Sequence, residues 1–187
     1  MGIIKTFDNV LTEQERLAII DEMLMPGVLV TETEVNYHRS VGRPNLGSSL
    51  VPLPKIHALA KSIYGNQIEF NNSYCRIYYN TSFLGIHSDR KRLDITMSVC
   101  LLKEFDHEWP LHISKVPFEG EYWDYKVKDT SHWQQDYTSH ELEENQAVVC
   151  EGKKYPHWRE TLECDDNKRA FYVFYHWRRK FPYQLMR

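Results

Sequence analysis

The chain has 187 residues, enough for one domain with a substantial core and too few for two of ordinary size. It contains 42% hydrophobic and 26% charged residues, as globular proteins do, and no apolar run long enough to span a membrane. Its net charge of −3 offers no attractive field to nucleic acid or to an anionic membrane, so we expect neither as a partner.

The first helix is predicted from its capping signal. Thr12 and Glu15 have the spacing of a capping box, in which each residue bonds the backbone amide of the other. A short extended segment at residues 3–7 precedes it, and Pro26-Gly27 ends the helix. Its apolar face is expected to consist of Leu17, Ile20 and Leu24.

The next segments alternate between extended and helical patterns. Residues 28–35 resemble a strand, and residues 38–49, rich in Gly, Ser, Arg and Asn, resemble a loop. Pro54 then opens a second helix that Gly65 closes. The buried face of this helix is expected to contain Ile56, Leu59, Ala60 and Ile63. Residues 1–66 are therefore predicted to be a helical buttress.

Short apolar or alternating runs dominate from residue 67 onward, bounded by polar or turn residues. None is long enough for a helix, which is typical of an antiparallel sandwich or barrel. The predicted strands are residues 67–70, 74–79, 95–102, 111–116, 147–151 and 171–177. Residues 119–144 lack a clear period and are expected to form a long insertion, a plausible lid. The chain is thus predicted to be a single domain, mainly β, with a jelly-roll core over residues 67–187.

One short motif carries the chemistry. His87-Ser88-Asp89 follows an extended segment, and no other histidine in the chain has an acid two residues later. Alternate residues of an extended segment project the same way, so both side chains can reach one metal ion. Two histidines and one carboxylate hold Fe(II) in non-haem oxygenases and leave three coordination positions open. His157, which follows a predicted strand, is the expected third ligand.

A basic residue follows the distal histidine at the start of the last strand. Lys168 and Arg169 precede the apolar run 171–177, where a cation can pair with the distal carboxylate of a metal-chelated 2-oxoglutarate. Arginine does this with two parallel hydrogen bonds, which favours Arg169. His176 is a rival distal ligand, but no strand follows it to supply the cation.

These residues, in this order, resemble the 2-oxoglutarate/Fe(II) dioxygenase superfamily, most closely its prolyl 4-hydroxylase-like group. The resemblance runs through Tyr78, His87-x-Asp89, Thr96, His157 and Arg169. It implies a double-stranded β-helix fold, with Fe(II), 2-oxoglutarate and O2 as cofactor and co-substrates and ascorbate as a possible reductant. It also implies that the chain hydroxylates a peptidyl-prolyl or other amino-acid-like substrate.

The resemblance further implies roles for neighbouring side chains. Tyr78 and Thr96 are expected to contact the co-substrate, with Arg169 or Lys168 at its distal carboxylate. Arg76 is a candidate for the same wall as Tyr78. Because Arg90 adjoins the metal ligands, it could bind an acidic substrate. The expected residues at the substrate mouth are Trp158 and Arg159.

The chain departs from the family around that mouth, which leaves other functions open. Glu108-Trp109-Pro110-Leu111 stands where the family usually has a Gly-Gly-x-Thr type of segment. An AlkB-like nucleic-acid demethylase is one alternative, but the arginine pair of that group is absent: Arg169 is followed six residues later by Tyr175. A non-enzymatic metal-binding jelly-roll domain is the other, and it would not need Arg169.

The cysteines indicate a reducing compartment. Cys75, Cys100, Cys150 and Cys164 form no Cys-x-x-Cys pair, and in a chain of this size they are typical of reduced thiols. The opening segment does not resemble a signal peptide. We therefore expect a cytoplasmic protein that acts on a small-molecule or peptide substrate.

Overall fold

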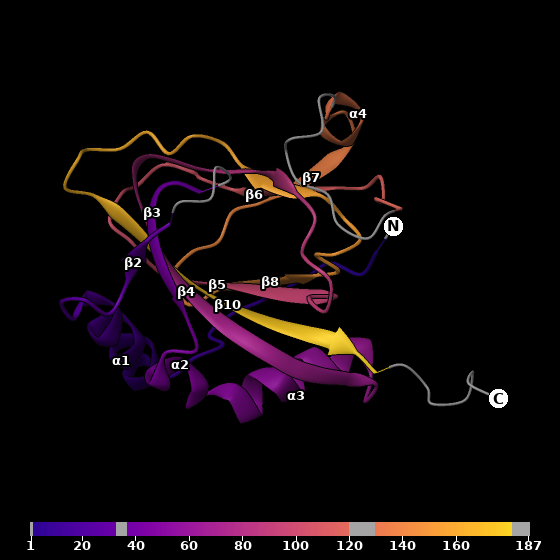
Figure 1. Ribbon diagram of the computed structural model, residues 1–187, viewed down its shortest axis with the longest axis horizontal. Helices are drawn as coiled ribbons and strands as arrows, with labels where there is room; N and C mark the ends of the chain where they lie inside the picture. Colours follow the sequence, from indigo (N-terminus) through magenta and orange to yellow (C-terminus); the bar gives the residue numbers. More distant parts are fainter. Residues whose placement is uncertain (1, 33–36, 120–129, 181–187) are drawn as a thin grey trace.

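The computed structural model describes residues 2–32, 37–119 and 130–180. Its strands form one antiparallel sheet that curls into two layers, with α1, α2 and α3 beneath one of them (Figure 1). The helices are α1 (Glu13–Leu24), α2 (Gly47–Leu50), α3 (Leu53–Tyr64) and α4 (Ser131–Gln134). The strands are β1 (Lys5–Phe7), β2 (Val30–Thr31), β3 (Tyr37–Pro44), β4 (Ile68–His87), β5 (Ile95–Lys103), β6 (Leu111–Ser114), β7 (Tyr137–His140), β8 (Ala147–Cys150), β9 (His157–Arg159) and β10 (Arg169–Arg179).

The longest strand, β4, joins the two layers. Residues 68–79 of β4 pair with β10, whereas Leu84 and His87 near its end pair with β9. The strands follow the order β1-β8-β5-β10-β4-β9-β6-β7, and β3 pairs with the opposite edge of β4. Two antiparallel layers connected in this way form the double-stranded β-helix that the sequence predicts. The two predicted strands 67–70 and 74–79 are thus one continuous strand.

The side chains of β10 alternate between two cores, as the pleat of a strand requires. The odd-numbered residues from Phe171 to Trp177 belong to the core that packs against α1 and α3. The even-numbered Tyr172 and Phe174 belong to the core enclosed between the two layers. A residue's position along β10 therefore decides whether it faces the helices or the interior.

Helix α1 begins as the sequence predicts. The Oγ1 of Thr12 accepts a hydrogen bond from the Glu15 amide at 3.2 Å, and the Glu15 carboxylate accepts one from the Thr12 amide at 2.7 Å. The predicted apolar face is wrong apart from Ile20, because Leu17 and Leu24 are 45% and 47% exposed. The contact with the sheet selects a different set of residues, Ile19, Ile20 and Met23.

Helix α3 also follows its sequence pattern. Ile56 and Ala60 are fully buried against the sheet, as predicted. The helix ends at Gly65, whose φ of 77° is unfavourable for residues with a side chain.

The loop predicted over residues 38–49 is wrong. Residues 37–44 form β3, which pairs with β4 and with the short β2. The polar composition of β3 gives no strand signal, because its backbone is held by ladder partners distant in sequence. Gly42 of β3 is required there, since a Cβ atom would lie 2.5 Å from the Tyr74 ring. Residues 1–66 therefore supply three strands as well as the helical buttress.

The insertion predicted over residues 119–144 is partly regular structure. Residues 120–129 lie outside the described part of the chain. Beyond them come α4 and β7, and β7 pairs with β6 to extend the upper layer (Figure 1). No strand was predicted here, because Tyr137–His140 is short and largely polar.

The described helices include none that is long and apolar enough to cross a membrane. All four cysteines are outside disulfides, and Cys75, Cys100 and Cys150 are buried.

We expect Thr12→Ala to lower the free energy of unfolding by about 1 kcal/mol, because the Glu15 amide loses its side-chain acceptor. Thr12→Ser keeps a hydroxyl at the same position and should retain most of the stability. Urea unfolding curves of the two variants and the original chain measure the difference. Equal midpoints for all three would show that the capping box does not stabilise α1.

Candidate metal centre

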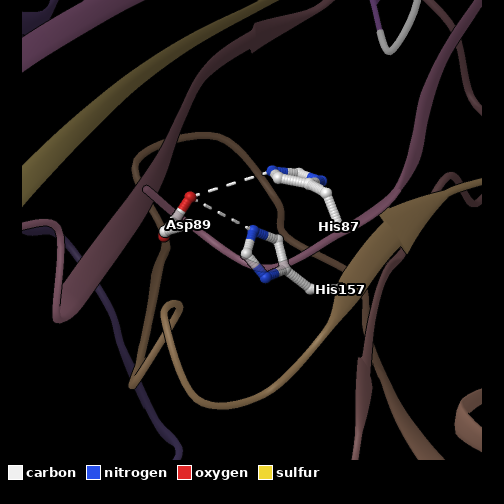
Figure 2. Close-up of side chains that lie close together, drawn as sticks. All are labelled: His87, Asp89 and His157. Carbon is white, nitrogen blue, oxygen red and sulfur yellow. Dashed lines mark ion pairs between the residues drawn. The ribbon is translucent and has the colours of Figure 1, made fainter. Parts of the chain in front are cut away.

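The pairing of β4 with β9 brings two histidines together. His87 is the last residue of β4, and His157, the first residue of β9, lies directly opposite it in the ladder. Asp89 follows in the next turn, and the three side chains point toward one another (Figure 2). The Asp89 Oδ1 is 3.8 Å from the Nε2 of each histidine. The ligand atoms of this His–Asp–His cluster lie within 4.8 Å of one another, as the sequence predicts for a metal site.

Backbone carbonyl groups fix the orientation of both imidazoles. The Nδ1 of His87 donates to the Gly85 carbonyl at 2.8 Å, and the Nδ1 of His157 donates to the Tyr155 carbonyl at 3.1 Å. A neutral imidazole that donates through Nδ1 keeps a lone pair on Nε2. Each Nε2 therefore faces the centre of the cluster as an electron-pair donor, the arrangement in which histidine binds a metal.

The surroundings favour the protonation states that metal binding requires. Burial lowers the pKa of His87 to about 3, with a smaller contribution from His157. Burial acts to raise the pKa of Asp89, but His157, His176, His87 and the Thr96 hydroxyl together lower it. At neutral pH, His87 is therefore neutral and Asp89 is ionised.

Thr96 and Gly152 hold the carboxylate in place. The Thr96 hydroxyl donates to Oδ2 of Asp89, and the Asp89 amide donates to the Gly152 carbonyl at 2.9 Å. A Cβ atom on Gly152 would lie 2.0 Å from Oδ2 of Asp89, so only glycine leaves room for the carboxylate. Thr96, expected to contact the co-substrate, lines the adjoining cavity and donates its hydroxyl hydrogen bond to Asp89.

A cavity of about 460 Å³ adjoins the His–Asp–His cluster. Arg76 and Glu32 line another part of its wall, and the exposed Arg90 also borders it. The Arg76 guanidinium donates to both carboxylate oxygens of Glu32 at 2.7 Å, while its Nη1 donates to the Tyr78 hydroxyl at 3.1 Å. Arg76 and Arg90, both predicted as substrate contacts, border the cavity, but the Arg76 charge is paired within the protein.

Two cavity residues were missed or given another role in the sequence analysis. Glu32 belongs to a segment predicted only as a strand, and nothing local in the sequence indicates its pairing with Arg76. His176, the rival ligand, lines the cavity from β10 opposite Thr96. Burial lowers the pKa of His176, and Asp89 partly opposes this, so the imidazole lies within electrostatic range of the cluster. The alternation along β10 could have indicated that His176 faces inward.

Arg169 does not reach the cavity, and this corrects the predicted co-substrate contact. Arg169 is the first residue of β10, and the odd-numbered residues of this strand face away from the enclosed interior. Its Nε and Nη2 donate to the Glu104 carboxylate at 3.1 and 2.9 Å. Lys168 borders a separate surface hollow together with Asp165.

The other predicted residues divide between the interior and the outer face. Tyr78 is fully buried, with its ring 4.9 Å from that of Trp109, and does not line the cavity. Trp158 packs with Ile86 and Trp133 on the outer face and does not line the cavity. Arg159 points into the interior, where its exposed fraction is 2%, and it does not line the cavity either.

We expect Gly152→Ala to weaken Mn(II) binding by about tenfold or more, because the added methyl would overlap Oδ2 of Asp89 and displace this candidate ligand from its position. Gly47→Ala is the matched control, since a Cβ atom there would make ordinary contacts no closer than 3.8 Å. Titration of Mn(II) followed by electron paramagnetic resonance measures both affinities. Unchanged binding in Gly152→Ala would show that Asp89 is not held as described.

No family model matches the sequence, and no curated protein matches it in sequence. Solved structures match it in fold. A prolyl-4-hydroxylase from Pseudomonas putida superimposes with a TM-score of 0.67 at 13% identity, covering 97% of this chain and 95% of that protein. The carbocyclase SnoK from nogalamycin biosynthesis gives 0.69 at 14% identity, covering 97% and 83%.

A third match contains the ligands of interest. HygX from Streptomyces hygroscopicus, solved with nickel and 2-oxoglutarate bound, gives a TM-score of 0.65 at 8% identity. The match covers 95% of this chain and 83% of HygX. Across nearly its whole length, the chain therefore shares the double-stranded β-helix fold of the 2-oxoglutarate/Fe(II) oxygenases.

Proposed function

We propose that the chain is a 2-oxoglutarate- and Fe(II)-dependent oxygenase. The observation that carries this proposal is the His–Asp–His cluster, with both Nε2 atoms facing Asp89 at the wall of a cavity of about 460 Å³. The fold shared with HygX, which was solved with nickel and 2-oxoglutarate, supports it.

The residues present fit an iron ion of this type. Two imidazole nitrogens and one carboxylate oxygen form the donor set of non-haem Fe(II) oxygenases. His87, Asp89 and His157 would hold the metal, and the adjoining cavity provides space for 2-oxoglutarate. When bound, iron supplies the redox chemistry by which O2 and 2-oxoglutarate are converted to an oxidant, succinate and CO2.

The chain itself contributes orientation and shielding. The Gly85 and Tyr155 carbonyls fix the imidazoles, and the Thr96 hydroxyl fixes the carboxylate. All three ligand side chains are at least nine-tenths buried, which limits the access of water to the reacting centre. Tyr74 and Arg76 complete the wall across the cavity.

Within this class, we propose hydroxylation of a peptidyl-prolyl or other amino-acid-like substrate, with ascorbate as a reductant. The fold likeness to the prolyl-4-hydroxylase of Pseudomonas putida supports this choice. Other proteins of the same fold include an epimerase and a carbocyclase, so the substrate class rests on the sequence resemblance. A cytoplasmic location is part of the proposal, supported by cysteines that form no disulfide.

Addition of Fe(II) and 2-oxoglutarate without O2 should produce a weak visible charge-transfer band, because the keto acid chelates the metal. His157→Ala should abolish the band by removing a ligand. His107→Ala, which changes an exposed histidine outside the cluster, should leave it intact. A domain that only stores metal would bind Fe(II) without forming the band, and that result would contradict the proposed oxygenase.

Release of succinate in air tests the substrate class. We expect proline-rich peptides or free amino acids to increase succinate release above the rate without substrate. A panel of both, compared at equal concentration, distinguishes peptide from free amino acid. If neither group of compounds increases succinate release, an amino-acid-like substrate is rejected. The binding of 2-oxoglutarate to the metal is tested separately, by the visible charge-transfer band.

A further inference from the structure

Arg159 lies deep in the interior, close in sequence to a candidate metal ligand. It is two residues after His157 in β9, so both side chains project to the same face of the strand. Its exposed fraction is 2%, and it is among the largest fully buried side chains of the described residues.

The Arg159 guanidinium is only partly satisfied by the protein. Its Cζ lies 4.7 Å from the ring centroid of Trp109 and 4.5 Å from that of Tyr172. Its Nη1 donates to the Trp109 carbonyl. Within residues 2–32, 37–119 and 130–180, however, its Nη2 has no hydrogen-bond partner. No carboxylate in these ranges forms an ion pair with it.

Burying a guanidinium with an unpaired N–H group lowers the stability of the fold unless a ligand accepts a hydrogen bond from it. A buried cation loses its hydration, and partners within the protein normally recover that loss. Arg76, the other buried arginine among the described residues, is compensated in this way by Glu32. Arg159 has aromatic faces and one carbonyl in place of a counter-anion. The pattern indicates a site for an anion rather than a structural ion pair.

The location relates this group to the cavity. Leu84 is opposite Arg159 in the β4–β9 ladder and lines the cavity beside the cluster. Cross-strand neighbours have Cβ atoms about 5 Å apart. Arg159 does not itself line the cavity, and it lies behind the lining residue Leu84. Phe174, also a lining residue, stacks on Tyr172 at 6.2 Å, and Tyr172 contacts the guanidinium. Arg159 is thus the next residue of β9 after His157 whose side chain faces the enclosed interior.

We propose that Arg159 binds the distal carboxylate of 2-oxoglutarate, whose keto-acid end would be held at the His–Asp–His cluster. This inference rests on the proposed function. The guanidinium would come from β9, next to a metal ligand, rather than from Arg169 at the start of β10. Arginine presents forked donors that match a carboxylate, and the unpartnered Nη2 supplies one of them.

Binding of two keto acids to Mn(II)-loaded protein tests the assignment without turnover. 2-Oxobutyrate has the same keto-acid end as 2-oxoglutarate and no distal carboxylate. Calorimetry should show that 2-oxoglutarate binds about a hundredfold more tightly, since it adds charge-assisted hydrogen bonds. Arg159→Met should remove most of this preference and leave the affinities for Mn(II) and 2-oxobutyrate unchanged. Methionine fills much of the same space with an apolar chain.

Arg169→Met is the matched control, because it removes the same group from the opposite face of the sheet. It should retain the full preference for 2-oxoglutarate. If Arg159→Met retains it too, the assignment of Arg159 is overturned while the proposed oxygenase stands. If the Mn(II)-loaded original chain binds neither keto acid, the proposed function itself fails.

Arg159→Lys decides the matter should the methionine variant not fold, as judged by thermal melting. Lysine keeps the positive charge but lacks the forked donors. It should therefore bind 2-oxoglutarate about tenfold more weakly than arginine does, with unchanged binding of 2-oxobutyrate. Equal affinity for 2-oxoglutarate in Arg159→Lys and the original chain would overturn the assignment.

Discussion

The antiparallel pairing of β4 with β9 is the constraint on which the candidate site depends. It sets His87 opposite His157, although the two residues are distant in the chain. Asp89 then reaches the same point from the turn after β4, where Thr96 of β5 and the backbone of Gly152 hold it. The carbonyls of Gly85 and Tyr155, each two residues before its histidine, set the direction of the Nε2 lone pairs. A slip of one residue in this ladder would turn one imidazole to the outer face.

Arg76 and Arg159, the buried arginines among the described residues, give the interior two different electrostatic regions. The Arg76 charge is cancelled by Glu32, so that part of the cavity wall is polar but close to neutral overall. Arg159 keeps its charge in a setting of aromatic rings, where a low local dielectric strengthens attraction to an anion. With Arg76 neutralised by Glu32, Arg159 is left as a buried cation without a counter-anion among the described residues. Arg76, Glu32 and the exposed Arg90 border the cavity itself.

Much of this arrangement could be predicted from local sequence patterns. The capping box of α1, the strands of the second half and the His87-x-Asp89 motif each depend on spacing within a few residues, and His157 is the expected third ligand because it follows a predicted strand. The strand at residues 37–44 could not, because its backbone is held by partners on β4. The choice of Arg169 failed because spacing from His157 says nothing of which face of β10 a residue occupies. Arg159 is two residues after His157 on one strand, so the two side chains face the same side. This signal was present in the sequence, but Arg159 was predicted to lie at the substrate mouth. The contact between Glu32 and Arg76 has no local signal at all.

The length of β4 has a consequence for how the chain reaches this state. One continuous strand serves both layers, with β10, the last strand, along one end and β9 at the other. Contacts so remote in sequence carry a high loop-closure entropy and are typical of slow folding. During synthesis, β4 leaves the ribosome after its partner β3 but well before β9 and β10, so the edge opposite β3 stays unpaired until those strands follow. The three side chains of the candidate metal centre converge only after the late strands dock, so metal capture would report the completion of folding rather than initiate it.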